Sequence, residues 1–192
     1  MKDLNICVDI DGTVTEAYYW LDLANEYFNM EVKEEDVKVY NIHEVMGISL
    51  EDFDRFYEIV GRQMHYDAKI RPGVKEALDL FYQDHYIHFV TARAQEMEEV
   101  SQAWLDKHAI ARDSLSLLGS HGKVETARAL KCDLFIEDRY ENALELAEAG
   151  FTVILINTSY NQGPTPANVI RLDSWYEIID IVESKDYKKV TA

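Results

Sequence analysis

The sequence predicts an α/β protein in which a parallel sheet lies between two layers of helices, a three-layer α/β/α core with a small helical cap inserted after the first strand. From residue 71 onward, short apolar runs alternate with segments whose apolar residues recur at helical spacing, which is the pattern of βαβ units. Between residue 14 and about residue 64 this alternation is interrupted, because the stretch has helical character. We therefore expect a core domain of residues 1–13 and 70–192, and a cap of residues 14–69.

Length and composition predict a globular protein with one main domain and an appendage. A chain of 192 residues removes roughly 70% of its unfolded surface from water on folding, so it can bury a sizeable core. Hydrophobic residues make up 47% of the sequence and aromatic residues 11%, a composition that excludes a disordered chain.

The charge balance restricts the partners. Thirty-six acidic residues against 19 basic residues give a formal net charge of −17. Nucleic acid polymers and anionic membranes are bound through clustered Lys and Arg, so neither is expected as a partner. A small phosphorylated metabolite is compatible with this charge, because charges more than about 8 Å apart are largely screened at physiological salt.

Cysteine use and the N-terminal residues favour a cytoplasmic protein. Cys7 lies inside an apolar strand and Cys132 just before another, without the spacing of metal ligands, so both are expected to be reduced and structural. The first residues lead directly into a strand, and no apolar segment has the length of a membrane span.

The first predicted strand ends in two carboxylates. The apolar run from Ile6 is too short for a buried helix and closes with Asp9 and Asp11 on alternate residues, followed by Gly12 and Thr13. Ligands of open parallel sheets bind beyond the carboxyl ends of the strands. A reaction centre is therefore expected at Asp9 and Asp11.

The cap is predicted to contain two helices. Thr15 is a candidate N-cap for the first, and Ser49 with Asp52 resembles a capping box for the second, with an aperiodic stretch between them. Their apolar stripes consist of Ala17, Trp20, Leu21, Ala24 and Phe28, and of Phe53, Phe56, Tyr57, Val60 and Met64. Tyr18 and Tyr19 fall outside the first stripe, so they point either to solvent or over the acidic loop.

The rest of the chain alternates between strands and helices. Strands are predicted at residues 86–90, 115–118, 133–136 and 151–156, the last of these being the final strand. Helices are predicted at residues 74–81, 97–105, 123–130, 143–149 and 175–182, with a loop at 157–168 and a frayed tail at 185–192.

Polar residues at strand ends and helix starts suggest phosphoryl chemistry. A carboxylate such as Asp9 can attack phosphorus, and a second one two residues on, Asp11, can protonate the leaving oxygen. Thr91 offers a hydroxyl, although taken alone it fits a helix N-cap equally well. Lys123, at a helix start, offers a positive charge.

Further groups accompany these four. Glu137 and Asp138, together with Asp9, offer the hard oxygen ligands that Mg²⁺ prefers. Arg93 contacts either a substrate phosphate or a surface acid. The histidines, His65 and His121 among them, show no metal-binding spacing and are interpreted as ordinary polar positions.

These residues, in this order, resemble the four signature motifs of the haloacid dehalogenase-like (HAD) superfamily of aspartate-nucleophile phosphatases, which have a Rossmann-like core. Within it, the chain is most similar to the cytosolic type C 5′(3′)-deoxyribonucleotidases. Residues 71–74, 135–139 and 171–175 support the resemblance, which covers nearly all of the core domain and is weak in the cap.

The resemblance implies a magnesium-dependent phosphomonoesterase that forms an aspartyl-phosphate and acts on (deoxy)nucleoside monophosphates. It implies that Asp9 is the nucleophile and a Mg²⁺ ligand, and that Asp11 is the acid/base and binds the metal through its backbone carbonyl. It also implies that Thr91 and Lys123 hold the phosphoryl group and that Asp138 binds Mg²⁺, with Glu137 beside it.

The chain departs from that family pattern in two places. Thr91-Ala92-Arg93 stands where these relatives carry Thr-Ser-Pro, and Glu137-Asp138 stands where they carry Asp-Asp. A phosphatase for another small ester, such as a sugar phosphate or a nucleic-acid 3′ end, therefore remains an alternative. A catalytically silent binding module on the same fold is a further alternative.

Overall fold

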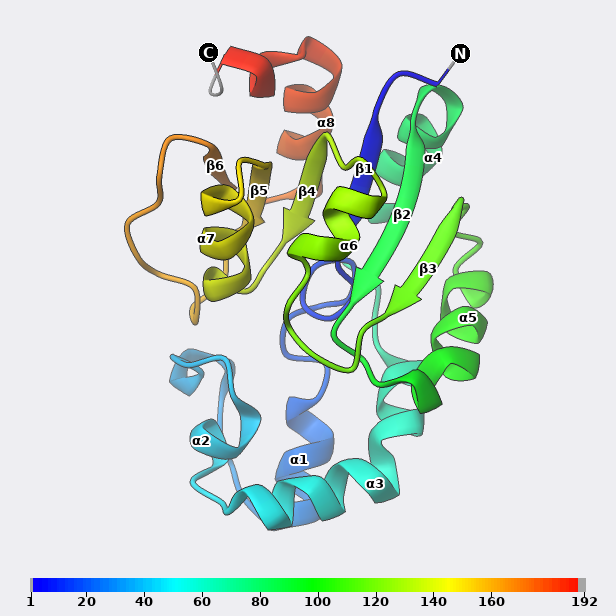
Figure 1. Cartoon of the computed structure of the whole chain (residues 1–192). Helices are drawn as coiled ribbons and strands as arrows, with labels where there is room; N and C mark the ends of the chain where they lie inside the picture. The colour runs from blue at the N-terminus through cyan, green and yellow to red at the C-terminus, as the bar shows by residue number, and fades with distance from the viewer. Residues whose placement is uncertain (1, 190–192) are drawn as a thin grey trace.

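The computed structural model describes residues 2–189, which form a six-stranded, entirely parallel sheet with helices on both faces (Figure 1). The strand order is β3-β2-β1-β4-β5-β6. The strands are β1 (Asn5–Val8), β2 (Tyr86–Thr91), β3 (Ser114–Leu117), β4 (Leu134–Glu137), β5 (Thr152–Ile156) and β6 (Val169–Leu172). The predicted α/β architecture is confirmed.

Helices on the two faces of the sheet bury two separate apolar cores. The α-helices are α1 (Leu21–Phe28), α2 (Ile42–Met46), α3 (Leu50–Asp67), α4 (Val74–Asp84), α5 (Glu98–Lys107), α6 (Val124–Ala129), α7 (Tyr140–Glu148) and α8 (Trp175–Ser184). Three short 3₁₀ turns are η1 (Glu34–Asp36), η2 (Gln95–Met97) and η3 (Asp186–Lys189). Helices α4, α5 and α8 cover one face, and α6 and α7 cover the other.

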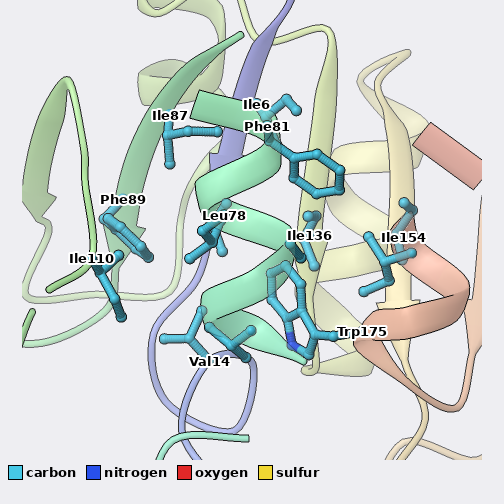
Figure 2. Packing of buried hydrophobic residues seen from close by; sticks show 14 of the residues in the cluster. Ile6, Val14, Leu78, Phe81, Ile87, Phe89, Ile110, Ile136, Ile154 and Trp175 are labelled. Carbon is cyan, nitrogen blue, oxygen red and sulfur yellow. The ribbon is translucent and has the colours of Figure 1, made fainter. Parts of the chain in front are cut away.

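Strand alternation explains why β1 contributes to both cores. Ile6 and Val8 join the cluster under α4 and α8, whereas Cys7 joins the cluster under α6 and α7. Figure 2 shows the larger core, in which Phe81 and Trp175 pack over the sheet. Both cysteines are buried and free, as predicted.

The segment after β1 is largely helical, as predicted, and has its own small core, but it contains three helices and not two, because the stretch without a clear period holds the short helix α2. Helices α1, α2 and α3 lie together beyond the carboxyl ends of the strands (Figure 1). Their buried apolar residues are Trp20, Leu21, Ala24, Val37, Met46, Phe56 and Met64. An antiparallel bridge between Thr15 and Ile70 ties the two ends of this cap together, and the exact domain boundaries stay a prediction.

Three further local predictions are wrong. β5 is not the last strand, because Val169–Leu172 adds the edge strand β6, which is too short and too weakly alternating to be recognised in the sequence. Thr15 is not a helix cap, because α1 begins at Leu21 and the Thr15 hydroxyl accepts the Gly12 N–H at 2.9 Å. The tail is not frayed throughout, since η3 is helical, while residues 190–192 lie outside the described residues.

The helix starts and lengths agree with other predictions. The Ser49 side chain accepts the Asp52 N–H at 3.1 Å, which confirms the predicted cap of α3. Within residues 2–189, no helix is both long enough and apolar enough to cross a membrane.

Trp175 links the largest core to the acidic loop, because its indole N–H donates to the Thr13 carbonyl at 3.0 Å inside the protein. We expect Trp175→Phe to lower the free energy of unfolding by about 1–3 kcal/mol, since that carbonyl loses its buried donor. Urea unfolding measures the change. Tyr176→Phe, at the neighbouring position that is 52% exposed, is the control and should change it by less than about 0.5 kcal/mol. Equal stability of the two variants would contradict the role of this bond.

Candidate active site

The sheet topology brings the predicted acids together. From β1 the chain proceeds outward to β2 and β3, and then returns to β4 on the other side of β1 before continuing to β5 and β6. Asp9 follows β1, Glu137 ends β4 and Asp138 follows it. These residues therefore lie at the switch point of the sheet, where open α/β sheets bind ligands.

Lys123 joins two of the buried carboxylates. It directly precedes α6, is 2% exposed, and its Nζ donates to Asp9 Oδ1 and, at 2.9 Å, to Glu137 Oε2. Asn142 Nδ2 donates to the other Glu137 oxygen at 2.6 Å. Burial disfavours the ammonium, but Asp9 and Glu137 hold the pKa of Lys123 above its ordinary value, so the group stays charged.

The loop after β1 packs against Asp138, whose carboxylate accepts two hydrogen bonds. Thr13 Oγ donates to Asp138 Oδ1 at 3.1 Å, and the Tyr160 hydroxyl donates to Asp138 Oδ2 at 2.5 Å. Gly12 has a φ of +78°, and a Cβ there would lie 2.2 Å from Asp138 Oδ2. Arg71 donates to the Gly12 carbonyl at 2.6 and 2.9 Å, which fixes the loop from outside. Glycine is therefore required by both conformation and space.

Asp9, Glu137 and Asp138 form a donor set that fits a divalent cation. Each offers an oxygen, and these atoms lie within 4.8 Å of one another. Burial raises the pKa of Asp9 to about 7 against the opposing charge of Lys123, and burial together with Asp9 raises the pKa of Asp138 to about 7. Three buried carboxylates share one ammonium, so the ionised cluster is costly without further positive charge. Hard oxygen ligands of this kind suit Mg²⁺.

Asp11 has a different set of partners. Arg93 Nε donates to Asp11 Oδ2 at 2.8 Å and Arg93 Nη2 donates to Oδ1 at 2.5 Å, a two-bond fork. Burial opposes a charge on Asp11, but Arg93 outweighs burial and holds the pKa of Asp11 well below its usual range. The sequence left two partners open for Arg93, a substrate phosphate or a surface acid. In the structure, Arg93 pairs with the carboxylate of Asp11. A contact with substrate stays a prediction.

Three cap residues lie around Asp11, of which Tyr19 had two open alternatives in the sequence, whereas Tyr57 and His65 were not foreseen there. The Tyr19 hydroxyl donates to Asp11 Oδ1 at 2.8 Å, which answers the open question of where Tyr19 points. His65 lies behind it, with Nδ1 at 3.1 Å from the Tyr19 hydroxyl and Nε2 at 2.8 Å from the Tyr57 hydroxyl. The one available signal was that Tyr57 and His65 lie eight residues apart, about two helical turns, and so near one side of α3.

Thr91 and Tyr18 have clear positions. Thr91 ends β2, is 1% exposed, and its hydroxyl accepts the Arg93 N–H at 3.3 Å. It does not cap a helix, since the next helical turn begins after Ala94, and its contact with a phosphoryl group stays a prediction. The Tyr18 hydroxyl lies 2.7 Å from Ser159 Oγ, away from Asp11's hydrogen bonds.

Tyr40 is a further cap residue near the carboxylates. Its ring centroid lies 5.7 Å from those of Tyr160 and His121, and the Arg139 guanidinium carbon lies 4.7 Å from its centroid. Burial and the nearby carboxylates raise the pKa of Tyr40 well above its ordinary value, so the phenol stays protonated. No sequence signal indicated Tyr40, because it lies in the aperiodic stretch between the cap helices.

Solved structures of haloacid dehalogenase-like hydrolases share this fold. A haloacid dehalogenase-like family hydrolase of Streptococcus pneumoniae has a TM-score of 0.66 at 14% identity, covering 93% of this chain and 98% of that one. A haloacid dehalogenase-like hydrolase of Xanthomonas campestris has a TM-score of 0.65 at 14% identity, with 97% of both chains covered. The fold, with a buried aspartate after β1, is that of a HAD-like hydrolase.

The chain belongs to the family described as "5′ nucleotidase, deoxy (Pyrimidine), cytosolic type C", which matches residues 2–187. It is 48% identical over 183 residues to a nucleotidase of Clostridium acetobutylicum, with 95% of each chain covered. It is thus a phosphomonoesterase of the nucleotidase type by family, which confirms the resemblance found in the sequence.

Gly12→Ala tests the packing of the acidic loop. The new Cβ would displace Asp138 or Tyr160 and strain a positive φ, so we expect phosphate release to fall by about 100-fold or more. Gly122→Ala is the control, because no atom lies within 4 Å of its added Cβ and its φ is not positive. Phosphate release and thermal unfolding are measured for both. Full activity of Gly12→Ala would show that the loop tolerates a side chain.

Proposed function

We propose that this protein hydrolyses (deoxy)nucleoside monophosphates with the help of Mg²⁺, through a phosphoryl group carried transiently on Asp9. The observation that supports this best is the buried contact of Lys123 with Asp9 beside Glu137 and Asp138. One Asp9 oxygen accepts from the Lys123 ammonium, and the other, Oδ2, has one hydrogen-bond partner among residues 2–189, Thr13 Oγ at 3.5 Å. Oδ2 is the attacking atom in this proposal.

The reaction has two displacement steps. Asp9 Oδ2 attacks phosphorus, the bond to the ester oxygen breaks, and the leaving oxygen takes a proton from Asp11. A water molecule then attacks the phosphoryl group, gives a proton to Asp11, and Asp9 is released as a carboxylate. Lys123 and the Thr91 hydroxyl stabilise the charge that builds up on the phosphoryl oxygens.

Magnesium would be held by Asp9 and Asp138, with Glu137 beside them and the Asp11 backbone carbonyl as a further ligand. When bound, it supplies positive charge to the phosphoryl oxygens and to the carboxylate cluster. Uncatalysed monoester hydrolysis needs up to about 10²¹-fold acceleration, whereas one general acid contributes about 10²–10⁴. Charge stabilisation by Lys123 and the cation therefore has to supply most of the rate.

The family description, a deoxy 5′ nucleotidase of cytosolic type C, supports the proposed substrate class and location. On this basis a small nucleotide is the substrate and the cytoplasm is the site of action. The acidic overall charge disfavours a polynucleotide as substrate.

A substrate panel tests the activity. With Mg²⁺, the purified protein should release phosphate from deoxynucleoside 5′- or 3′-monophosphates with a higher kcat/KM than from sugar phosphates. Asp9→Asn should lower kcat/KM for the nucleotides by about a thousandfold or more, because the amide is a poor nucleophile. The fold should persist, since the amide oxygen can still accept a hydrogen bond from Lys123. Asp54→Asn, at an exposed position of α3, is the matched control. Preferential turnover of sugar phosphates would favour the alternative ester class, and absence of any turnover would favour the silent module.

Metal dependence is a separate prediction. EDTA should abolish phosphate release and Mg²⁺ should restore it. Because a ligand that binds the folded state stabilises it, Mg²⁺ should also raise the Tm of the wild-type protein, and this shift should shrink in Asp138→Asn. The Tm measurement is independent of turnover. An unchanged Tm shift in Asp138→Asn would remove that residue from the metal site.

A further inference from the structure

Asp11 is held from two sides by residues that come from different parts of the chain. On the core side, Arg93 donates two hydrogen bonds to its carboxylate, and a third guanidinium nitrogen, Nη1, donates to Ser101 Oγ at 2.9 Å. Ser101 in turn donates to the Met97 carbonyl at 2.7 Å. Arg93 is therefore tied to η2 and α5, and its own side chain is 1% exposed.

On the cap side, the Tyr19 hydroxyl donates to the same carboxylate, and His65 and Tyr57 complete a chain of hydrogen bonds behind it. The direction of this chain can be assigned. The single Tyr19 proton goes to Asp11, so the Tyr19 oxygen accepts from Nδ1–H of His65, and the bare Nε2 accepts from the Tyr57 hydroxyl. Every member is then satisfied by a neutral imidazole with its proton on Nδ1.

These hydrogen bonds fix the orientation of the Asp11 carboxylate, which matters for proton transfer. A proton donor works only within hydrogen-bond reach of the leaving oxygen, about 2.6–3.2 Å, so the orientation of the Asp11 carboxylate matters as much as its presence. Three hydrogen bonds to two oxygens leave that carboxylate little freedom to rotate. One of these three hydrogen bonds comes from the cap residue Tyr19. The orientation of the Asp11 carboxylate therefore depends directly on the position of the cap.

We propose that Arg93 and Tyr19 are positioning residues for Asp11, one from the core and one from the cap, with His65 and Tyr57 fixing the Tyr19 hydroxyl. The proton-transfer group of the site is then assembled jointly by the two units. This inference rests on the proposed function, in which Asp11 protonates the leaving oxygen. In this proposal Arg93 orients Asp11, whereas the sequence left open a contact between Arg93 and the substrate phosphate.

Two substrates with different leaving groups test this proposal. A deoxynucleoside alkoxide needs a proton to leave, whereas p-nitrophenolate leaves as a stable anion and does not. The value of kcat/KM reports steps up to departure of the leaving group, so the later hydrolysis of the phosphoryl-enzyme does not affect it. For Arg93→Lys and Tyr19→Phe we expect kcat/KM for the nucleotide to fall by about 10- to 100-fold, and kcat/KM for p-nitrophenyl phosphate by less than about threefold.

The comparison variants sharpen the result. Asp11→Asn should show the same selective loss, and larger. His65→Gln should show it in weaker form, because Tyr19 keeps its bond to Asp11. Tyr18→Phe is the matched control, a neighbouring tyrosine whose hydroxyl bonds to Ser159, and both kcat/KM values should stay at the wild-type level. Tyr19→Phe removes one hydroxyl only, so it tests the proposal even where Arg93→Lys does not fold.

Three results would contradict the proposal, and each has a different meaning. Equal losses for the two substrates in Arg93→Lys and Tyr19→Phe would overturn the proposal, because a residue that binds the shared phosphate, or merely supports the fold, affects both alike. A gain in kcat/KM for the nucleotide would also overturn it, since Arg93 would then restrain Asp11. A wild-type protein that releases phosphate from neither compound would overturn the proposed function, and this inference with it.

Discussion

The site depends on one buried ammonium placed among carboxylates. Lys123 Nζ contacts Asp9 and Glu137 where hardly any water reaches them, and each charge makes the others tolerable in that environment. The contact requires the end of β1, the end of β4 and the start of α6 to meet at one edge of the sheet. The strand order supplies this meeting point, because β1 and β4 are neighbours although 125 residues separate Thr13 from Asp138. Removing the Lys123 ammonium would leave buried carboxylates without a counter-charge, so the fold and the site constrain each other.

Much of this arrangement could be predicted because its signals are local. An apolar run that closes with acids marks the end of a strand, and parallel strands end at the same edge, so Asp9 and Glu137 could be placed together from sequence. Lys123 could be selected as the basic group because it stands at a helix start, and the structure brings it to Asp9. β6 could not be predicted in this way, because four residues with one buried side chain show too little alternation to distinguish a strand from a loop.

The surroundings of Asp11 could not be predicted in the same way. Helical periodicity identifies which side of α3 is buried, but it does not say what that side meets. The contacts of Asp11 with Arg93 and Tyr19 span 82 and 8 residues and depend on how the cap lies against the core. The same holds for Tyr40, whose stretch has no period, and whose ring is placed by packing against Tyr160 and His121.

Two carboxylates that look equivalent in the sequence are distinguished by these surroundings. Burial raises the pKa of Asp9 to about 7, whereas Arg93 holds the pKa of Asp11 below its usual range. A cation bound at Asp9 would lower the pKa of Asp9 and favour the ionised form that the proposed nucleophile needs. In the proposed reaction, the ionised form of Asp11 suits the second step, in which Asp11 would accept a proton from water. For the first step Asp11 has to carry a proton, and an arriving phosphate dianion acts in that direction, because added negative charge raises the pKa of a neighbouring acid. On the proposed mechanism, the substrate itself would therefore help to convert Asp11 from base to acid.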